Sequence, residues 1–262
     1  MNLNLENKVF LISGGAKGIG AAISRTIAEE GGIAVIIDPT KEAGEILSQE
    51  LTTKNYKAYH IPLRLMEPEQ AQEAIELAID KFGRIDGVVN NAGANDGIGL
   101  EHGSPLSFRK SVEQNLGHYY DLVHFALPYL KTSKGSIVNI SSKTAITGQG
   151  NTSGYTAAKG AQLSLTREWA VELLPYGIRV NAVIPAEVMT PLYQRWLDTF
   201  DNPEEKLNLI QERIPFEKRM TTPQEIANTV VFLLSGRSSH TTGQHIFVDG
   251  GYTHLDRAIG RE

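Results

Sequence analysis

Tyr155 and Lys159 lie one helical turn apart in the segment SGYTAAKGAQLSLTREWA, and their spacing predicts a proton-transferring pair. A phenol with an ordinary pKa of about 10 is a poor base at neutral pH. An ammonium on the same helix face favours the phenolate through its opposite charge. We therefore expect Lys159 to lower the pKa of Tyr155 and to make it a general acid/base for a hydroxyl group. By itself the spacing is weak, because helix surfaces produce it by chance.

A glycine-rich turn near the start of the chain strengthens this interpretation. The apolar run KVFLIS at 8–13 predicts a buried strand, and AAISRTIAEEGG from residue 21 predicts a helix with a glycine stop. Between them lies the sequence Gly14-Gly15-Ala16-Lys17-Gly18-Ile19-Gly20. Strand, glycine turn and helix together are typical of a dinucleotide site, because the backbone approaches a pyrophosphate at the helix N-terminus. An ordinary tight turn is the alternative.

The residue that ends the second predicted strand favours NAD over NADP. The strand IAVIID at 33–38 places Asp38 about 20 residues beyond the glycine turn, where an acidic side chain binds the adenosine ribose hydroxyls. A carboxylate there repels the 2′-phosphate of NADP. Lys17 argues in the opposite direction, because a cation beside the turn could bind that phosphate. We give Asp38 the greater weight and treat NADP as the less favoured cofactor.

Composition excludes several classes of function. The net charge is −5 and the 25 basic residues are scattered, which argues against nucleic-acid binding. The chain has no cysteine, so disulfides, thiolate metal sites and cysteine nucleophiles are excluded, and we expect no metal site. The N-terminus MNLNLENK lacks the features of a signal peptide, and no apolar stretch approaches 18 residues. These features predict a cytoplasmic protein without a membrane partner.

The predicted elements alternate between strand and helix through most of the chain, which indicates an α/β fold. We expect a doubly wound (Rossmann) sheet of seven parallel strands with helices on both faces, in a single domain spanning residues 1–262. The strands are predicted at 8–13, 33–38, 57–62, 85–90, 135–141, 177–184 and within 241–251; the helices follow the glycine turn and cover 41–53, 67–83, 106–130, 153–174 and 223–234.

Residues 190–222 interrupt this alternation. The segment is polar, contains aromatic residues such as Trp196, and follows a strand's carboxyl end, where α/β sheets bind ligands. We predict a helical lid over the site. An ordinary surface helical hairpin is the alternative.

Taken together, these motifs resemble the short-chain dehydrogenase/reductase family over essentially the whole chain. The family's glycine turn matches Ser13, Gly14, Gly18 and Gly20, and its strand-four signature matches Asn90-Asn91-Ala92-Gly93. Its catalytic residues match Asn115, Ser142, Tyr155 and Lys159 in order and spacing. Its motif after strand six matches Pro185-Ala186, with Val188 and Thr190 beyond it.

The resemblance implies a role for each matched residue. Tyr155 would take the substrate hydroxyl proton while a hydride passes to nicotinamide, and Ser142 would hold the substrate oxygen. Lys159 would also bind the nicotinamide ribose, and Asn115 would hold a water in a proton relay. The residues implied in cofactor binding are Ser13, Gly14, Lys17, Gly18, Ile19, Gly20, Asp38, Asn90, Ala92, Gly93, Tyr155, Lys159, Pro185, Val188 and Thr190. A homotetramer is implied by the resemblance only.

Two positions depart from the family pattern. The aspartate that usually contacts adenine after strand three is replaced near Leu63-Arg64-Leu65, so backbone groups would have to hold the adenine. Ala186 stands in place of a glycine and adds a methyl group near the nicotinamide, which is tolerated if its φ is negative.

Polar residues gather where the substrate is expected. They favour a polyhydroxylated ligand over a steroid or fatty-acyl chain, because buried hydroxyls need partners. The predicted substrate-binding residues are Asn95, Ser142, Gln149, Asn151, Tyr155, Glu187 and Trp196. Asn95 and Asp96 could instead be turn formers, and Asp96 and Lys143 could be solvated loop charges.

Longer stretches, such as NNAGANDGIGL and NAVIPAEVMTPLY, resemble bacterial L-fucose dehydrogenases within this family. That resemblance implies oxidation of the anomeric hydroxyl of L-fucose or a related aldose by NAD, giving a lactone. One alternative is an NADPH-dependent 3-oxoacyl or ketone reductase, which Asp38 and the polar loops disfavour. Another is an NAD-responsive binding protein that has lost its chemistry. The tail YTHLDRAIGRE is a candidate contact with a neighbouring subunit.

Overall fold

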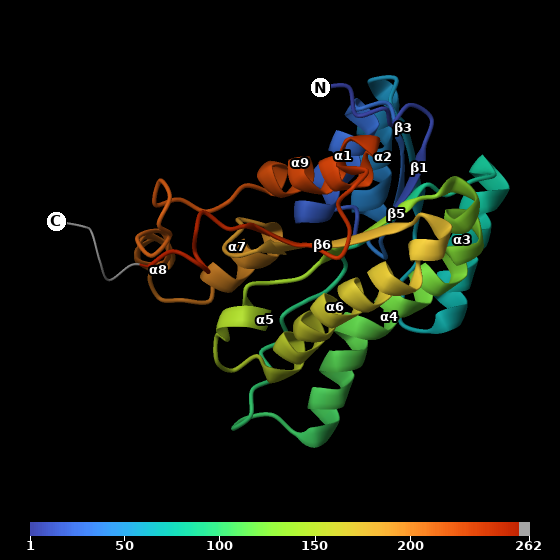
Figure 1. Cartoon of the computed structure of the whole chain (residues 1–262). Coiled ribbons are helices and arrows are strands. Elements are labelled where there is room, and N and C mark those ends of the chain that lie inside the picture. Colours follow the sequence, from blue (N-terminus) through green and yellow to red (C-terminus); the bar gives the residue numbers. More distant parts are fainter. Residues whose placement is uncertain (257–262) are drawn as a thin grey trace.

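Seven segments of the chain form one parallel sheet in the computed structural model, which describes residues 1–256 (Figure 1). The strand order is β3-β2-β1-β4-β5-β6-β7. The strands are β1 (Val9–Ser13), β2 (Ile33–Ile37), β3 (Lys57–Ile61), β4 (Gly87–Asn90), β5 (Ser136–Ile140), β6 (Arg179–Pro185) and β7 (His245–Val248). The predicted fold class is therefore confirmed.

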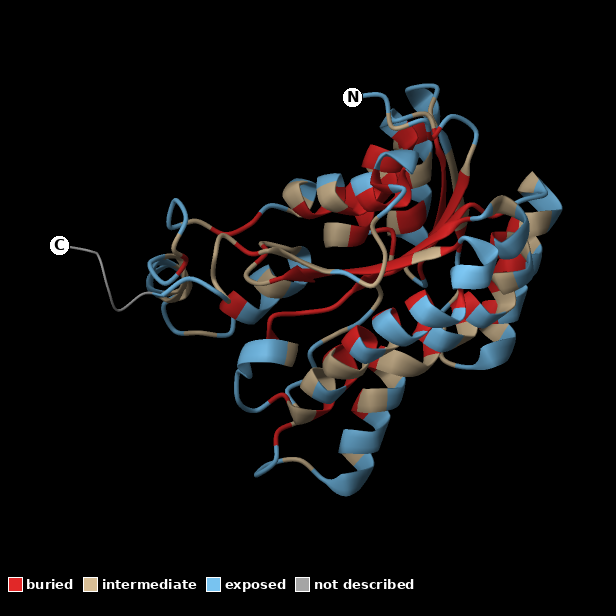
Figure 2. Cartoon of the chain, in the orientation of Figure 1, coloured by how far each residue is buried: buried red, intermediate tan, exposed pale blue. Residues whose placement is uncertain are grey.

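The central strands are buried on both faces, which explains why they are continuously apolar. All five residues of β1 and of β2 are buried, and they pair in register from Val9 with Ile33 to Ser13 with Ile37 (Figure 2). β1 has β2 on one side and β4 on the other, so the chain reverses its direction of winding there. Ligands of doubly wound sheets bind beyond the carboxyl ends of the strands at such a reversal.

Helices cover the sheet in two layers (Figure 1). One layer holds α1 (Gly18–Glu29), α2 (Lys41–Thr53) and α9 (Pro223–Leu234), and the other holds α3 (Pro68–Phe82), α4 (Pro105–Ser133) and α6 (Ser153–Glu172). Short elements complete the chain: α5 (Thr144–Thr147), α7 (Pro191–Leu197), α8 (Pro203–Gln211), and the 3-10 turns η1 (Leu174–Tyr176) and η2 (Gly236–Ser238).

Local sequence signals explain several helix boundaries. α3 begins at a capping box between Glu67 and Gln70 and ends at Gly83 in the left-handed conformation. α9 begins at a capping box between Thr222 and Glu225. These two helices match their predicted ranges closely. α4 is longer than predicted because it continues to Ser133, and it contains Pro128 within its length.

A ladder of buried amides and hydroxyls joins the sheet to α4 and α6. Asn90 Nδ2 donates to Asn139 Oδ1 (3.0 Å) and to Tyr119 O (3.3 Å), and Asn139 Nδ2 donates to Thr166 Oγ1 (2.9 Å). All four residues are fully buried. Because a buried amide is costly without partners, this ladder fixes how the two helices sit on the sheet.

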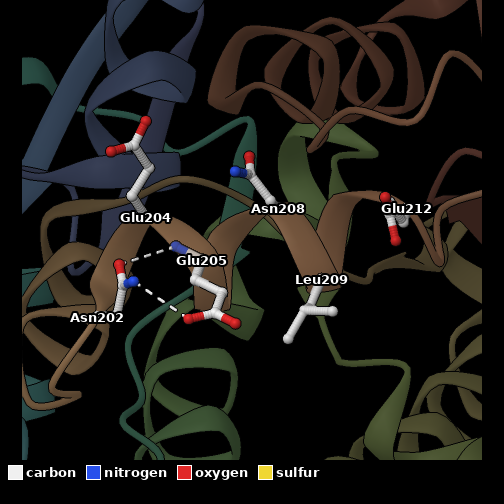
Figure 3. Close-up of a pocket in the computed structure, with 6 residues that line it drawn as sticks. All are labelled: Asn202, Glu204, Glu205, Asn208, Leu209 and Glu212. Atoms are coloured by element: carbon white, nitrogen blue, oxygen red, sulfur yellow. Dashed lines mark hydrogen bonds between the residues drawn. The ribbon is translucent and has the colours of Figure 1, made fainter.

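The segment 190–222 forms α7 and α8 beyond the carboxyl end of the sheet (Figure 1), and its role as a lid stays a prediction. α7 begins at its N-cap Thr190, whose side chain accepts from Tyr193 N, and buries Leu197, whereas α8 has no buried residue. A hollow at α8 is lined by acidic and amide side chains and by one leucine: Asn202, Glu204, Glu205, Asn208, Glu212 and Leu209 (Figure 3). Its lining includes none of the predicted site residues.

No helix in residues 1–256 combines the length and the apolar character needed to cross a bilayer. The last part of the tail considered above, residues 257–262, lies outside the described residues.

Candidate active site

The predicted proton-transferring pair lies on the face of α6 that packs against the sheet and α4. Lys159 is 3 % exposed, and its Nζ lies 5.6 Å from the centroid of the Tyr155 ring. Nζ donates to Ile140 O at the end of β5 (2.7 Å) and to the hydroxyl of Tyr119 on α4 (3.2 Å). The two side chains are therefore neighbours, and the ammonium is fixed by hydrogen bonds to groups from two other elements, β5 and α4.

Burial dominates the electrostatics of the pair. It raises the pKa of Tyr155 to about 12, and a hydrogen bond with Ser142 opposes this rise. Burial also lowers the pKa of Lys159 to about 7. The expected lowering of the Tyr155 pKa by Lys159 is therefore wrong in this structure: burial raises that pKa, and Lys159 Nζ makes its hydrogen bonds with Ile140 O and Tyr119.

Ser142 follows β5 and lies beside Tyr155, as predicted. Its Oγ accepts hydrogen bonds from Thr144 N (3.3 Å) and from Thr144 Oγ1 (3.1 Å), which orient its own O–H away from α5. The preceding residue, Ser141, donates its hydroxyl to Lys159 O (2.8 Å) and so binds the strand end to α6. Ser142 and Tyr155 together present two hydroxyl groups at one point, which suits an alcohol or carbonyl oxygen.

Asn115 connects three parts of the site. Its Oδ1 accepts from Ala94 N (2.8 Å), its Nδ2 donates to Ser111 O (2.9 Å), and its backbone oxygen accepts from Gln162 Nε2 (2.7 Å). It thereby joins the loop after β4 to α4 and α6. Its part in a water-mediated relay stays a prediction.

The glycine turn between β1 and α1 fits a dinucleotide. Gly14 and Gly18 have positive φ values of 63° and 54°, and a Cβ on Gly20 would collide with the Gly14 carbonyl. The N-cap of α1, Lys17, makes no side-chain hydrogen bond to the helix. Backbone N–H groups at such a helix start can bind a phosphate. The half-buried Ile19 and the exposed Lys17 lie within the turn.

Two residues hold this turn against the end of β4. Ser13 Oγ accepts from Asn91 N (3.0 Å) and from Ala92 N (3.1 Å). Asn91 Nδ2 donates to Ser13 O (3.0 Å) and to Gly14 O (3.1 Å). We had not predicted a role for Asn91, although its position within the strand-four signature was a signal that could have indicated one.

Asp38 lies against the glycine turn, as its predicted role requires. Its Oδ2 accepts from Ala16 N (3.3 Å) and its Oδ1 from Thr40 N (2.8 Å), so both oxygens are oriented. On the opposite side, a Cβ on Gly18 would lie 3.3 Å from Thr190 Cβ, which brings the start of α7 to the turn. Val188 is buried and pairs with Thr221 in a short bridge.

The other predicted cofactor residues differ in what their side chains can reach. Asn90 is buried in the core ladder with its side chain bonded to Asn139, so only its backbone groups are left for cofactor binding, and that role stays a prediction. Gly93 is exposed, and a Cβ there would lie 3.6 Å from Lys159 Nζ. Pro185 ends β6, and its carbonyl accepts from Lys143 N (2.9 Å), which joins the strand end to the residue after Ser142.

The predicted substrate residues fall into two groups. Ser142 and Glu187 lie inside the site, whereas Asn95, Gln149, Asn151 and Trp196 are exposed around it. Asn95 Oδ1 accepts from Gly97 N (3.2 Å), a contact that agrees with the alternative in which Asn95 forms a turn. Asp96 Oδ1 accepts from Ser111 Oγ (2.9 Å). Asp96 therefore belongs to the loop's own structure.

A polar cluster stands next to Ser142. Lys143 and Glu187 form an ion pair in which the side chains are 8 % and 12 % exposed. Tyr193 of α7 donates its hydroxyl to the other oxygen of Glu187 (2.7 Å), and Lys143 Nζ lies 4.0 Å from the Tyr252 ring centroid. The interpretation of Lys143 as a solvated loop charge is wrong, because it is buried by this cluster. We had not predicted a role for Tyr193, which lies six residues after Glu187, within α7.

Comparisons with known proteins agree with this geometry. The family model described as enoyl-(acyl carrier protein) reductase matches residues 14–253. A 3-oxoacyl-(acyl-carrier-protein) reductase of Thermotoga maritima is 35 % identical over 250 residues, covering 95 % of this chain and 99 % of its own. An L-fucose dehydrogenase of Rattus norvegicus is 36 % identical over 247 residues, covering 94 % and 89 %. The crystal structure of Cj0485 dehydrogenase is 48 % identical with a TM-score of 0.94, and each chain is covered completely.

The buried ammonium predicts a pH-dependent cost to stability. Because the pKa of Lys159 is about 7 in the folded chain, the unfolded chain binds more protons above that pH, and stability gains with rising pH. Relative to Lys159→Met, which carries no charge, the wild type should gain about 2 kcal/mol of unfolding free energy between pH 7 and pH 9. Urea unfolding of both proteins at pH 7 and pH 9 measures this gain. If the wild type and Lys159→Met differ in unfolding free energy by the same amount at both pH values, the prediction is wrong.

Proposed function

Since this chain belongs to the short-chain dehydrogenase/reductase family and is an oxidoreductase acting on CH–OH groups, we propose that its substrate is an aldose, L-fucose or a related sugar. The sugar is oxidised at its anomeric carbon to an aldonolactone, with NAD as cofactor. The observation that carries this proposal is the polar cluster beside Ser142. A buried ion pair of Lys143 and Glu187, with the Tyr193 hydroxyl, offers charged and neutral partners for several hydroxyl groups.

The chain's own residues divide the work in the following way. Ser142 and Tyr155 bind the oxygen of the reacting hydroxyl, and Tyr155 accepts its proton. Because burial favours the phenol form of Tyr155, the phenolate that accepts the proton is the minor form, and the charge of Lys159, 5.6 Å from the ring centroid, is the nearby group that can stabilise it as it forms. NAD, when bound, supplies the hydride-accepting chemistry, and the glycine turn with Asp38 would hold its pyrophosphate and adenosine ribose.

The preference for a sugar over an acyl chain rests on what surrounds Ser142. A pocket for an acyl chain is mostly apolar. Here the residue after Ser142 is a buried lysine paired with a half-buried glutamate, and an alkyl chain would offer this ion pair no further hydrogen-bond partner. Sugar hydroxyls would supply such partners. The similarity to L-fucose dehydrogenases supports the same choice, and the equal similarity to a 3-oxoacyl reductase makes that class the second candidate.

The first prediction concerns turnover and its dependence on Tyr155. With NAD and a panel of aldoses including L-fucose, the wild type should produce NADH, measured by absorbance. Tyr155→Phe should lower kcat/KM by at least about 100-fold, because general acid–base catalysis is typically worth that much. Tyr176→Phe, an exposed tyrosine outside the site, is the matched control. Equal rates for wild type and Tyr155→Phe would reject the proposed mechanism.

The second prediction concerns the choice of cofactor. Asp38→Asn keeps the shape of the side chain and removes the charge that opposes a 2′-phosphate, so the preference for NAD over NADP in kcat/KM should fall at least about tenfold. Glu42→Gln removes an exposed carboxylate early in α2 and should leave the preference unchanged. A wild type that uses NADP as well as it uses NAD would refute the assignment.

The third prediction concerns the polar cluster. Glu187→Gln should raise KM for the preferred sugar about tenfold, since a charge-assisted hydrogen bond contributes about 1.5 kcal/mol or more. It should leave kcat/KM for cyclohexanol, an alcohol with one hydroxyl, nearly unchanged. Glu212→Gln on the exposed face of α8 serves as the control. If both substrates lose activity equally, Glu187 acts on the catalytic groups and not on sugar recognition.

A further inference from the structure

Tyr119 is a buried hydroxyl group that the proposed mechanism does not use. It lies on α4, one turn after Asn115, and is fully buried. Its O–H donates to Ile140 O (3.0 Å), and its oxygen accepts from Lys159 Nζ (3.2 Å). Because Lys159 donates to the same carbonyl (2.7 Å), the three groups close a triangle of hydrogen bonds.

The surroundings of Lys159 explain why this hydroxyl matters. Lys159 forms no salt bridge among the described residues. The titratable groups that face it are Tyr155 from α6 and Tyr119 and His118 from α4; from β5 it meets only backbone oxygen. Burial and the nearby Lys159 lower the pKa of His118 to about 4, so its ring is neutral under assay conditions. Two neutral oxygens therefore carry the stabilisation of a buried cation.

We propose that Tyr119 is a positioning residue: its hydroxyl oxygen accepts a hydrogen bond from Lys159, keeps the ammonium protonated and holds it beside the Tyr155 ring. The inference rests on the proposed function, because it concerns the lysine of that same catalytic pair. An ammonium has three N–H donors. Ile140 O and Tyr119 take two of them, which leaves the third for the active-site side of Lys159.

Gln162 supports the same arrangement from the next turn of α6. It is fully buried, its Nε2 donates to Asn115 O (2.7 Å), and it lies beside the Tyr119 hydroxyl. Its Oε1 is buried without a hydrogen-bond partner among the described residues. The polar groups on this side of Lys159 thus come from four residues of α4 and α6, counting Asn115 and His118 together with Tyr119 and Gln162.

The proposal predicts a particular change in the pH profile. Below the pKa of Lys159 the ammonium is charged with or without Tyr119, so Tyr155 experiences the same charge. In Tyr119→Phe the ammonium of Lys159 loses its proton at a lower pH than in the wild type. The plot of kcat/KM against pH for Tyr119→Phe should therefore coincide with that of the wild type at low pH. It should level off about one pH unit below the wild type, so that its plateau value of kcat/KM is roughly tenfold lower.

The experiment measures sugar oxidation from pH 5 to pH 10 at saturating NAD. Tyr120→Phe is the matched control, because Tyr120 is the next residue, is 54 % exposed and stacks on His124. Its profile should match wild type. A Tyr119→Phe profile that superimposes on wild type overturns the proposal. So does a loss of equal size at every pH, which indicates a purely structural role.

A second measurement does not need turnover, so failure of the proposed function and failure of this inference are distinguishable. The wild-type and Lys159→Met chains differ in unfolding free energy by an amount that begins to change near pH 7. With Tyr119→Phe in both chains, the change should begin about one pH unit lower. An unchanged onset overturns the proposal even if no sugar is oxidised. If Tyr119→Phe does not fold, Tyr119→Met, which fills the space flexibly, takes its place in both experiments.

Discussion

The site depends on one buried ammonium that no carboxylate neutralises within the described residues. Lys159 sits where desolvation lowers its pKa to about 7, and it stays in place because Ile140 O and the Tyr119 hydroxyl accept its hydrogen bonds. A carboxylate partner would keep the lysine charged, but it would also oppose the negative charge of an ionised Tyr155. Neutral oxygens avoid that conflict, and the lysine then remains sensitive to each hydrogen bond that it makes.

The sheet and helices can be understood as the support for this charge. Ile140 O belongs to the end of β5, Tyr119 to α4 and Lys159 to α6, so the triangle exists only when two helices and a strand keep fixed positions. The buried ladder of Asn90, Asn139 and Thr166 fixes those positions with directional bonds, which apolar packing alone does not provide. The ladder that stabilises the fold therefore also positions the site, because it joins α4 and α6 to the sheet beside Lys159.

The cofactor side and the substrate side of the site meet at the start of α7. Thr190 lies against Gly18 of the turn, and three residues later the Tyr193 hydroxyl binds Glu187. Glu187 in turn pairs with Lys143, the residue after Ser142. A movement of α7 would therefore act on both sides of the site together. α8, which has no buried residue, is free of this constraint and resembles the surface hairpin considered as the alternative.

The sequence alone determined the sheet, most helix boundaries and the identity of the pair Tyr155 and Lys159, because these follow from local periodicity, glycine turns and helical spacing. It also placed Asp38 at the glycine turn, since the position follows from one βαβ unit. Only the tertiary structure decided that Lys159 is directed to Ile140 O and Tyr119, that Asn90 serves the core, and that Lys143 is buried against Glu187. These facts join residues that are far apart in the chain, and the desolvation that sets their pKa values arises only when separate elements pack together.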